Sequence, residues 1–202
     1  MSFMIRRRID LLCVQETRWK GAAAKDLGSG FKLLYSGGDT TRNGVGIVLH
    51  PTLTLLVKEV IRVSDRLMAV RIQMKEGPVF VISGYAPQQG CEDEKKTGFL
   101  NSLEDLLDKA EENDLVFLAS DLNAHVGKDR RGYEEVLGAH GVGDRNEEGE
   151  ALLDFCLRNK MSVANTWFEK QESHKITCRS GRATTQIDFI SMRKVDMKKM
   201  TD

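Results

Sequence analysis

The chain has 202 residues, of which 41% are hydrophobic and 30% charged, and its formal net charge at pH 7 is zero. This length allows one substantial domain, and the composition is that of an ordinary globular protein. The zero net charge disfavours nucleic-acid binding through bulk electrostatics, although a local basic groove remains compatible with it.

The four cysteines are widely spaced and include no CxxC pair, which disfavours a disulfide framework or a zinc site and favours a reducing compartment. No apolar run approaches the length of a membrane span, and the N-terminus shows no signal-peptide pattern. We therefore expect a nuclear or cytoplasmic protein that is not secreted and does not associate with membranes.

Short strands are expected in the first half, where apolar runs or alternating patterns are bounded by turn residues. A basic helix precedes them, and the sequence Arg42-Asn43-Gly44 is typical of a hairpin turn. The strands are expected at residues 9–15, 31–36, 44–49, 67–74 and 78–84, with a β-rich stretch at 52–63.

The second half alternates helices and strands, which indicates an α/β protein. Helices are expected at 97–113, whose apolar residues recur at a spacing of three and four, and at 147–159, where Asn146 can cap the first turn. Strands are expected at 115–119 and 162–168, and 175–179 is expected to pair with 185–192 across a turn at 180–182. Residues 128–144 are expected to be an irregular loop, and 197–202 a frayed tail.

The strand at 115–119 runs directly into Asp121 and Asn123. Because side chains two residues apart in a strand point to the same side, these two polar groups should project together from the end of the sheet. Open α/β folds place their ligands at such ends. An Asx-type turn, in which the same residues cap a loop, is the alternative interpretation.

Apolar runs end at or contain polar residues in five places, which indicates a shared rim. Carboxylates and carboxamides without clustered His or Cys are hard oxygen donors that select Mg²⁺ or Mn²⁺. A Mg²⁺ ion held by one or two carboxylates and a substrate phosphate is the usual arrangement for phosphate chemistry. The polar residues are Glu16, Tyr85, Asp121 with Asn123, Asn165, and Asp188.

The segments IDLLCVQETRW, VISGYAP, LASDLNAHVG, NTWF and TTQIDFI, in this order, resemble the endonuclease/exonuclease/phosphatase superfamily. Within it, the chain is most similar to the apurinic-type endonuclease domain of LINE retrotransposons of the RTE kind. The resemblance covers nearly the whole chain. It implies a DNase I-like two-sheet β-sandwich flanked by helices, a single domain over residues 1–196, and Mg²⁺-dependent hydrolysis of DNA phosphodiester bonds by a monomer.

Residue roles follow from the resemblance only where its motifs match. Glu16 corresponds to the principal metal ligand, for Mg²⁺ with Mn²⁺ as the alternative, and Tyr85 to a tyrosine that contacts the phosphate. Asp121 corresponds to the residue that positions or activates the water, and Asn123 to one that holds the phosphate. Asp188 corresponds to the aspartate that orients a catalytic histidine.

Three residues are expected to bind substrate DNA. Asn165 is close to the family's additional asparagine, and Thr177 lies where the retrotransposon enzymes have a DNA-contacting segment. Arg179 belongs to a basic stretch after residue 173 that is compatible either with a DNA phosphate track or with a solvated face.

The departures from the family concern its first and last strands. The family begins with a strand that carries an asparagine and ends with a Ser-Asp-His motif, and neither is found in this chain. We therefore expect a chain truncated at both ends, in which activity is in doubt. A catalytically inactive derivative that acts as a binding module is the main alternative, and a phosphatase acting on a small phosphoester is another. His125, next to the Asp121 motif, is expected to be a loop histidine.

Overall fold

The computed structural model describes residues 1–181 and 183–201. Within these ranges the chain forms a mixed α/β structure with two main sheets, of four and six strands, and a separate two-stranded ribbon. The expected two-sheet α/β architecture is confirmed. The chain divides into two compact units: unit 1 comprises Met1–Tyr85 and Asn101–Val116, and unit 2 comprises Ala86–Leu100 and Phe117–Asp202. Each unit is described separately.

Unit 1 contains the four-stranded sheet, in the order β1-β4-β3-β2 with antiparallel neighbours. Three further antiparallel strands follow in the chain as a meander. The strands are β1 (Leu11–Gln15), β2 (Ala22–Asp26), β3 (Lys32–Ser36), β4 (Val45–Leu49), β5 (Val57–Ser64), β6 (Leu67–Met74) and β7 (Gly77–Tyr85), and the short helices are α1 (Ser2–Arg7) and α2 (Pro51–Thr54).

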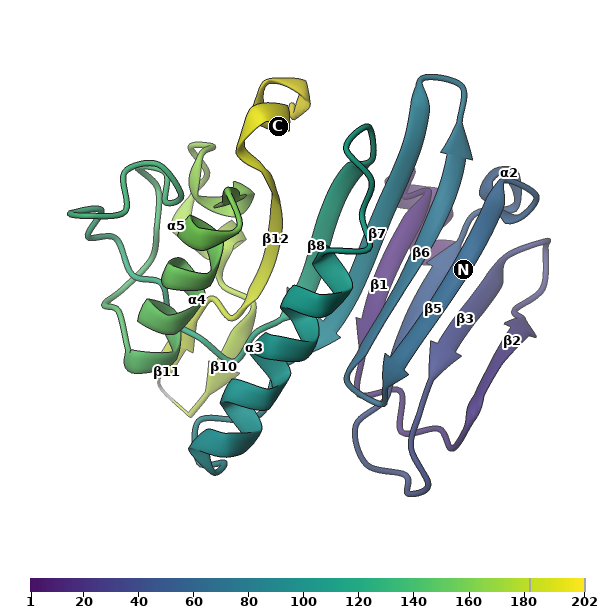
Figure 1. The fold of residues 1–202 in the computed structure, drawn as a ribbon, viewed down its shortest axis with the longest axis horizontal. Coiled ribbons are helices and arrows are strands. Elements are labelled where there is room, and N and C mark those ends of the chain that lie inside the picture. Colours follow the sequence, from purple (N-terminus) through teal and green to yellow (C-terminus); the bar gives the residue numbers. More distant parts are fainter. Residues whose placement is uncertain (182, 202) are drawn as a thin grey trace. The chain divides into compact units, whose positions relative to one another are not determined.

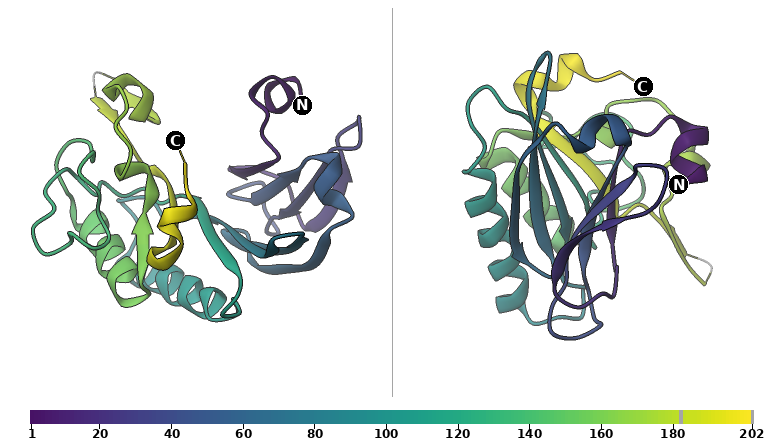
Figure 2. Two further views of the ribbon diagram at one scale, coloured as in Figure 1. Left: turned by 90° about the horizontal axis from the view of Figure 1, so that it is seen from above. Right: turned by 90° about the vertical axis from the view of Figure 1, so that its right-hand side faces the viewer.

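The core of unit 1 lies between these two groups of strands, which Figure 2 shows as two layers, the first coloured purple to blue and the second blue to teal. β1, β3 and β4 contact strands of the β5-β6-β7 meander face to face. β4 is buried along its whole length because it is a central strand of one layer and packs on β6 and β7 of the other. This packing brings the ends of β1 and β7 together, since these two strands also contact each other.

Unit 2 is built on β12 (Asp188–Arg193), which lies beside β8 (Leu115–Asp121) in Figure 1 and pairs antiparallel with it. On its other side β12 pairs antiparallel with β9 (Met161–Val163). Helix α4 (Glu147–Arg158) contacts β9 and buries an apolar face. Its expected cap is confirmed, because Asn146 Oδ1 accepts a hydrogen bond from Gly149 N at 2.8 Å. The remaining elements are α3 (Asp93–Leu107), η1 (Ala164–Thr166), α5 (Glu172–Lys175), the ribbon of β10 (Cys178–Ser180) and β11 (Ala183–Thr185), and η2 (Lys194–Lys199).

Several sequence-based element predictions for unit 1 were wrong in detail. Strand β2 was missed because every one of its residues is exposed, so no alternating pattern marks it. The β-rich stretch expected from residue 52 begins instead as helix α2, since Pro51 occupies its first turn and His50 accepts a hydrogen bond from Thr52 N as its cap. The strand itself starts at Val57.

Other predictions were wrong in unit 2 and in α3. Helix α3 begins at Asp93 and ends at Leu107, earlier at both ends than expected. The strand expected at 162–168 ends at Val163, where the Thr166 hydroxyl donates a hydrogen bond to Val163 O and closes a 3-10 turn. In place of the hairpin expected from 175 to 192, the chain forms a short ribbon and then the separate strand β12. The expected turn at 180–182 includes position 182, which lies outside the described residues.

Within the described ranges, no helix has the length and apolar character needed to cross a lipid bilayer.

Candidate active-site residues

Glu16 lies immediately after β1, and its carboxylate is held by two hydrogen bonds. Oε1 accepts from the Tyr85 hydroxyl at 2.7 Å, and Oε2 accepts from Arg18 Nη2 at 2.8 Å. These bonds lower the pKa of Glu16, the one from Tyr85 contributing most. Glu16 is therefore an ionised carboxylate at neutral pH, and its side chain remains 43% exposed.

The loop that carries Glu16 is clamped by the turn between β3 and β4. Thr17 N donates to Gly44 O at 3.1 Å, and Arg18 N donates to Asn43 O at 2.9 Å. Gly44 has φ +98°, and a Cβ at this position would lie 2.2 Å from the Thr17 hydroxyl oxygen, so only glycine fits. The Asn43-Gly44 turn signal in the sequence thus fixes the backbone next to Glu16.

Tyr85 ends β7 and is 4% exposed. Its position is fixed by Arg66, a residue that sequence reasoning missed. The Arg66 guanidinium lies 4.9 Å from the centre of the Tyr85 ring, and its Nη1 donates to Tyr85 O at 3.0 Å. Tyr85 N donates in turn to Arg66 O at 2.8 Å. The sequence could have indicated this role only through the place of Arg66, which directly precedes a strand that pairs with β7.

Asp121 and Asp188 are register partners on the antiparallel strands β8 and β12 of unit 2. Directly opposed residues of such a pair have Cβ atoms ~4.5–5.5 Å apart on the same face. Burial raises the pKa of Asp188, and a hydrogen bond with the Thr177 side chain partly offsets this effect. Unit 2 therefore places Asp121 and Asp188 opposite each other on neighbouring strands, and the Asp188 carboxylate is kept partly out of water.

Asp121 and Asn123 form the Asx-type turn that was the alternative to a functional interpretation. Asp121 Oδ1 accepts from Asn123 N at 3.1 Å, and Asn123 has a left-handed backbone with φ 46°. The turn is anchored to Ala86, whose N–H donates to Asp121 O and whose carbonyl accepts from Asn123 Nδ2, both at 2.9 Å. The Asn123 backbone N–H binds Asp121 Oδ1 and the Asn123 Nδ2 group binds Ala86 O, so these bonds hold both side chains in place.

The three residues expected to bind substrate lie near β12 and on the ribbon. Thr177 Oγ1 accepts hydrogen bonds from the N–H groups of Ile187 and Asp188 at 3.0 and 3.2 Å, so it fixes the start of β12. Asn165 Oδ1 accepts from Ile190 N at 2.6 Å. Arg179 is exposed on β10.

The candidate residues thus form two clusters. Unit 1 brings together Glu16 and Tyr85 with Arg18 and Arg66, and unit 2 brings together Asp121, Asn123 and Asp188 with Thr177. The chain connects them directly, because Tyr85 of the first cluster is followed by Ala86, which anchors the second.

Glu16 fits a divalent metal as a single protein ligand. Among residues 1–181 and 183–201, no group of three or more His, Cys, Asp or Glu side chains could hold a metal ion. Mg²⁺ does not require such a group, because it usually keeps several waters and takes one or two carboxylates together with substrate phosphates. The ionised and partly exposed Glu16 carboxylate meets this requirement.

Comparison with known proteins confirms the predicted resemblance. No family model matches the chain. Craniofacial development protein 2 from Tragulus javanicus and from Bos taurus is 31% identical to it over 195 residues, which are 95% of this chain. The chain spans about one third of the length of these curated relatives.

The solved structures that resemble the chain are of the endonuclease/exonuclease/phosphatase type. The endonuclease domain of TRAS1, a telomere-specific non-LTR retrotransposon, matches with a TM-score of 0.65 at 13% identity, over 98% of this chain and 78% of that one. D. rerio TDP2 complexed with a single-strand DNA product gives 0.60 at 15% identity, over 95% and 74%. An endonuclease/exonuclease/phosphatase family protein from Leptotrichia buccalis gives 0.59 at 13% identity, over 94% and 78%. These matches establish that the chain has this fold.

Proposed function

We propose that the chain is a Mg²⁺-dependent endonuclease of retrotransposon origin that hydrolyses phosphodiester bonds in DNA. The observation that carries the proposal is the state of Glu16, a carboxylate held ionised by Tyr85 and Arg18 where the family has its metal ligand. The similarity to the TRAS1 endonuclease domain supports the choice of DNA.

In this proposal, the unit 1 cluster binds the metal. When bound at Glu16, Mg²⁺ would polarise the scissile phosphate and neutralise part of the charge that develops on it. The Tyr85 hydroxyl donates its single proton to Glu16, so we assign it to holding this carboxylate rather than to contacting the phosphate as first expected. Arg66 fixes Tyr85 by packing on its ring and by donating a hydrogen bond to its carbonyl oxygen.

The unit 2 cluster handles the attacking water and the phosphate oxygens. Asp121 accepts a hydrogen bond from the water and orients it for attack. Asp188, the register partner of Asp121 on β12, has a pKa raised by burial and can take up the proton that the water releases. Asn123 keeps a second N–H for a phosphate oxygen, since only one is used on Ala86.

Nicking of supercoiled plasmid tests the proposal, with Mg²⁺ or with EDTA. Asp121→Asn keeps the oxygen that accepts from Asn123 N but loses the charge, so it should lower nicking by ~10²-fold or more without unfolding the protein. Asp105→Asn, an identical change at an exposed position on α3, is the matched control and should nick like the wild type.

Absence of metal-dependent nicking by the wild type would overturn the proposal. A gel-shift assay with the same plasmid would then decide whether the chain is an inactive DNA-binding module. Hydrolysis of p-nitrophenyl phosphate at a rate above that of plasmid nicking would point instead to the phosphatase alternative.

A further inference from the structure

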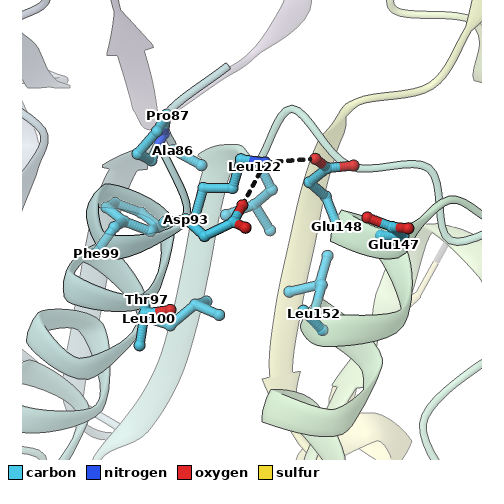
Figure 3. A pocket seen from close by; sticks show the side chains of 12 residues that line it. Ala86, Pro87, Asp93, Thr97, Phe99, Leu100, Leu122, Glu147, Glu148 and Leu152 are labelled. Atoms are coloured by element: carbon cyan, nitrogen blue, oxygen red, sulfur yellow. Dashed lines mark hydrogen bonds and ion pairs between the residues drawn. The ribbon is translucent and has the colours of Figure 1, made fainter. Parts of the chain in front are cut away.

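Among the described residues of unit 2, two cavities differ in charge. The first lies between α3 and α4 and has a volume of about 260 Å³. Asp93, Glu147 and Glu148 line it together with a single cation, Lys96, which is bound to Asp93 at 3.2 Å and to Glu148 at 3.0 Å (Figure 3). Its other lining residues are mostly apolar, as Phe99, Leu100, Leu122 and Leu152 in Figure 3 show. This net negative cavity repels phosphates.

The second cavity, which we call the η1–α5 cavity, has a volume of about 160 Å³. Among the described residues that line it there is no carboxylate, and Lys170 and Lys175 give it a positive charge; His174 also lines it. Lys175 Nζ is held at its edge by a hydrogen bond to His140 O at 3.1 Å. The nearby Glu169 and Glu172 are exposed and do not line it.

Two amide side chains, Asn165 and Gln186, also line the η1–α5 cavity. Asn165 is fixed by its Oδ1, which accepts from Ile190 N, so its NH₂ group is the end that can donate to a ligand. Gln186 is 6% exposed, and within the described part of the chain its Oε1 has no hydrogen-bond partner. Buried acceptors are normally paired, so Gln186 marks a place where a donor is missing.

A nucleotide has the chemistry that this lining matches. Asn and Gln amides pair with the donor and acceptor edges of bases, aromatic rings such as Phe168 stack on them, and cations bind the adjoining phosphate. The volume is below the ~300–1,000 Å³ of pockets that enclose a whole drug-sized ligand, so only one base can enter. Its phosphate would then lie at the edge, beside Lys170, His174 and Lys175.

We propose that the η1–α5 cavity binds one unpaired nucleotide of the DNA strand; the choice of DNA as ligand rests on the proposed function. Inserting a base from a duplex requires breaking its pairing and stacking, so single-stranded or locally unpaired DNA binds better than duplex. The cavity is thus a substrate-selecting subsite for unpaired DNA.

Fluorescence anisotropy with a labelled dT12 oligonucleotide in EDTA tests this subsite without cleavage. Asn165→Asp keeps the Oδ1 that accepts from Ile190 N and replaces the donor with a charged oxygen, so binding should weaken about tenfold. Lys128→Gln changes the net charge by the same amount at an exposed site outside both cavities and should weaken binding less than about twofold.

Gln186→Leu provides a readout that a purely structural role would not give. It removes a buried acceptor without a partner, so the midpoint of thermal unfolding should stay equal or rise while dT12 binding falls about tenfold. A fall in both would assign Gln186 to the stability of unit 2 and overturn its role in binding.

Three results would overturn the proposal: equal weakening by Asn165→Asp and Lys128→Gln, duplex binding as tight as dT12 binding, or competition by inorganic phosphate as strong as that by dTMP. The last would show an anion site only. The two proposals fail separately. Loss of cavity-dependent binding in a wild type that nicks plasmid refutes the subsite alone, and cavity-dependent dT12 binding without nicking refutes hydrolysis alone.

Discussion

Glu16 in unit 1 and Asp188 in unit 2 are both carboxylates at strand ends, but their surroundings act on them in opposite directions. Glu16 accepts hydrogen bonds from Tyr85 and Arg18, which lower its pKa and keep it charged. Asp188 is partly buried opposite Asp121, and burial raises its pKa. Donors stabilise the charged form, and loss of water destabilises it.

This difference suits the two carboxylates to different tasks. A metal ligand must be ionised, whereas a group that takes part in proton transfer benefits from a greater affinity for the proton. This difference is the reason why the proposed function gives metal binding to the unit 1 cluster and proton transfer to the unit 2 cluster. Four substitutions test this assignment.

The largest expected effect is that of Glu16→Gln. The amide oxygen can still accept from Tyr85, but the charge that binds Mg²⁺ is lost. Plasmid nicking should fall by ~10²–10³-fold, with part of the activity recovered at high Mg²⁺. A Mg²⁺ titration of the nicking rate measures this. An unchanged Mg²⁺ dependence would remove Glu16 from the metal site.

Tyr85→Phe should have a smaller effect, about tenfold on the nicking rate. It removes the hydrogen bond that contributes most to the lowered pKa of Glu16 and leaves the ring that packs on Arg66. The acidic limb of the pH–rate profile should therefore move to higher pH. If the rate fell without a shift of that limb, Tyr85 would act on the phosphate and not through Glu16.

Thr177→Val should lower the free energy of unfolding by ~1 kcal/mol, because two backbone N–H groups at the start of β12 lose their acceptor. It also removes the hydrogen bond that opposes the raised pKa of Asp188, so nicking should fall a few-fold and its acidic limb should move to higher pH. Thr177→Ser keeps the hydroxyl and is the matched control. Equal behaviour of the two variants in urea unfolding would contradict this role.

Asp188→Asn should have the smallest effect on stability, and the size of this effect depends on pH. Burial raises the pKa of Asp188, so the folded protein binds this proton more tightly than the unfolded chain, and the wild type loses stability as pH rises through that pKa. The variant should therefore melt at a higher temperature than the wild type at pH 7, and the gap should close below the ordinary value of 3.8. Thermal unfolding at pH 7 and pH 3 checks this, and a gap of the same size at both would exclude the charge as its cause.

Several features were predicted correctly because they depend on residues close together in the sequence. The Asn146 cap needs only Gly149, three residues away, and the Asn43-Gly44 turn depends on the freedom of glycine at positive φ. Glu16, Tyr85 and Asp121 were likewise visible, because an apolar run of strand length stops at each of them.

The sequence by itself therefore determined the α/β fold class, the carboxylates and amides near the strand ends, and the similarity to endonuclease/exonuclease/phosphatase proteins. Tertiary structure alone decided the pairing of Asp121 with Asp188, the packing of Arg66 on Tyr85 and the support of Asp188 by Thr177. The physical reason is that strand register and burial arise from residues far apart in the chain, and they set which carboxylate stays charged.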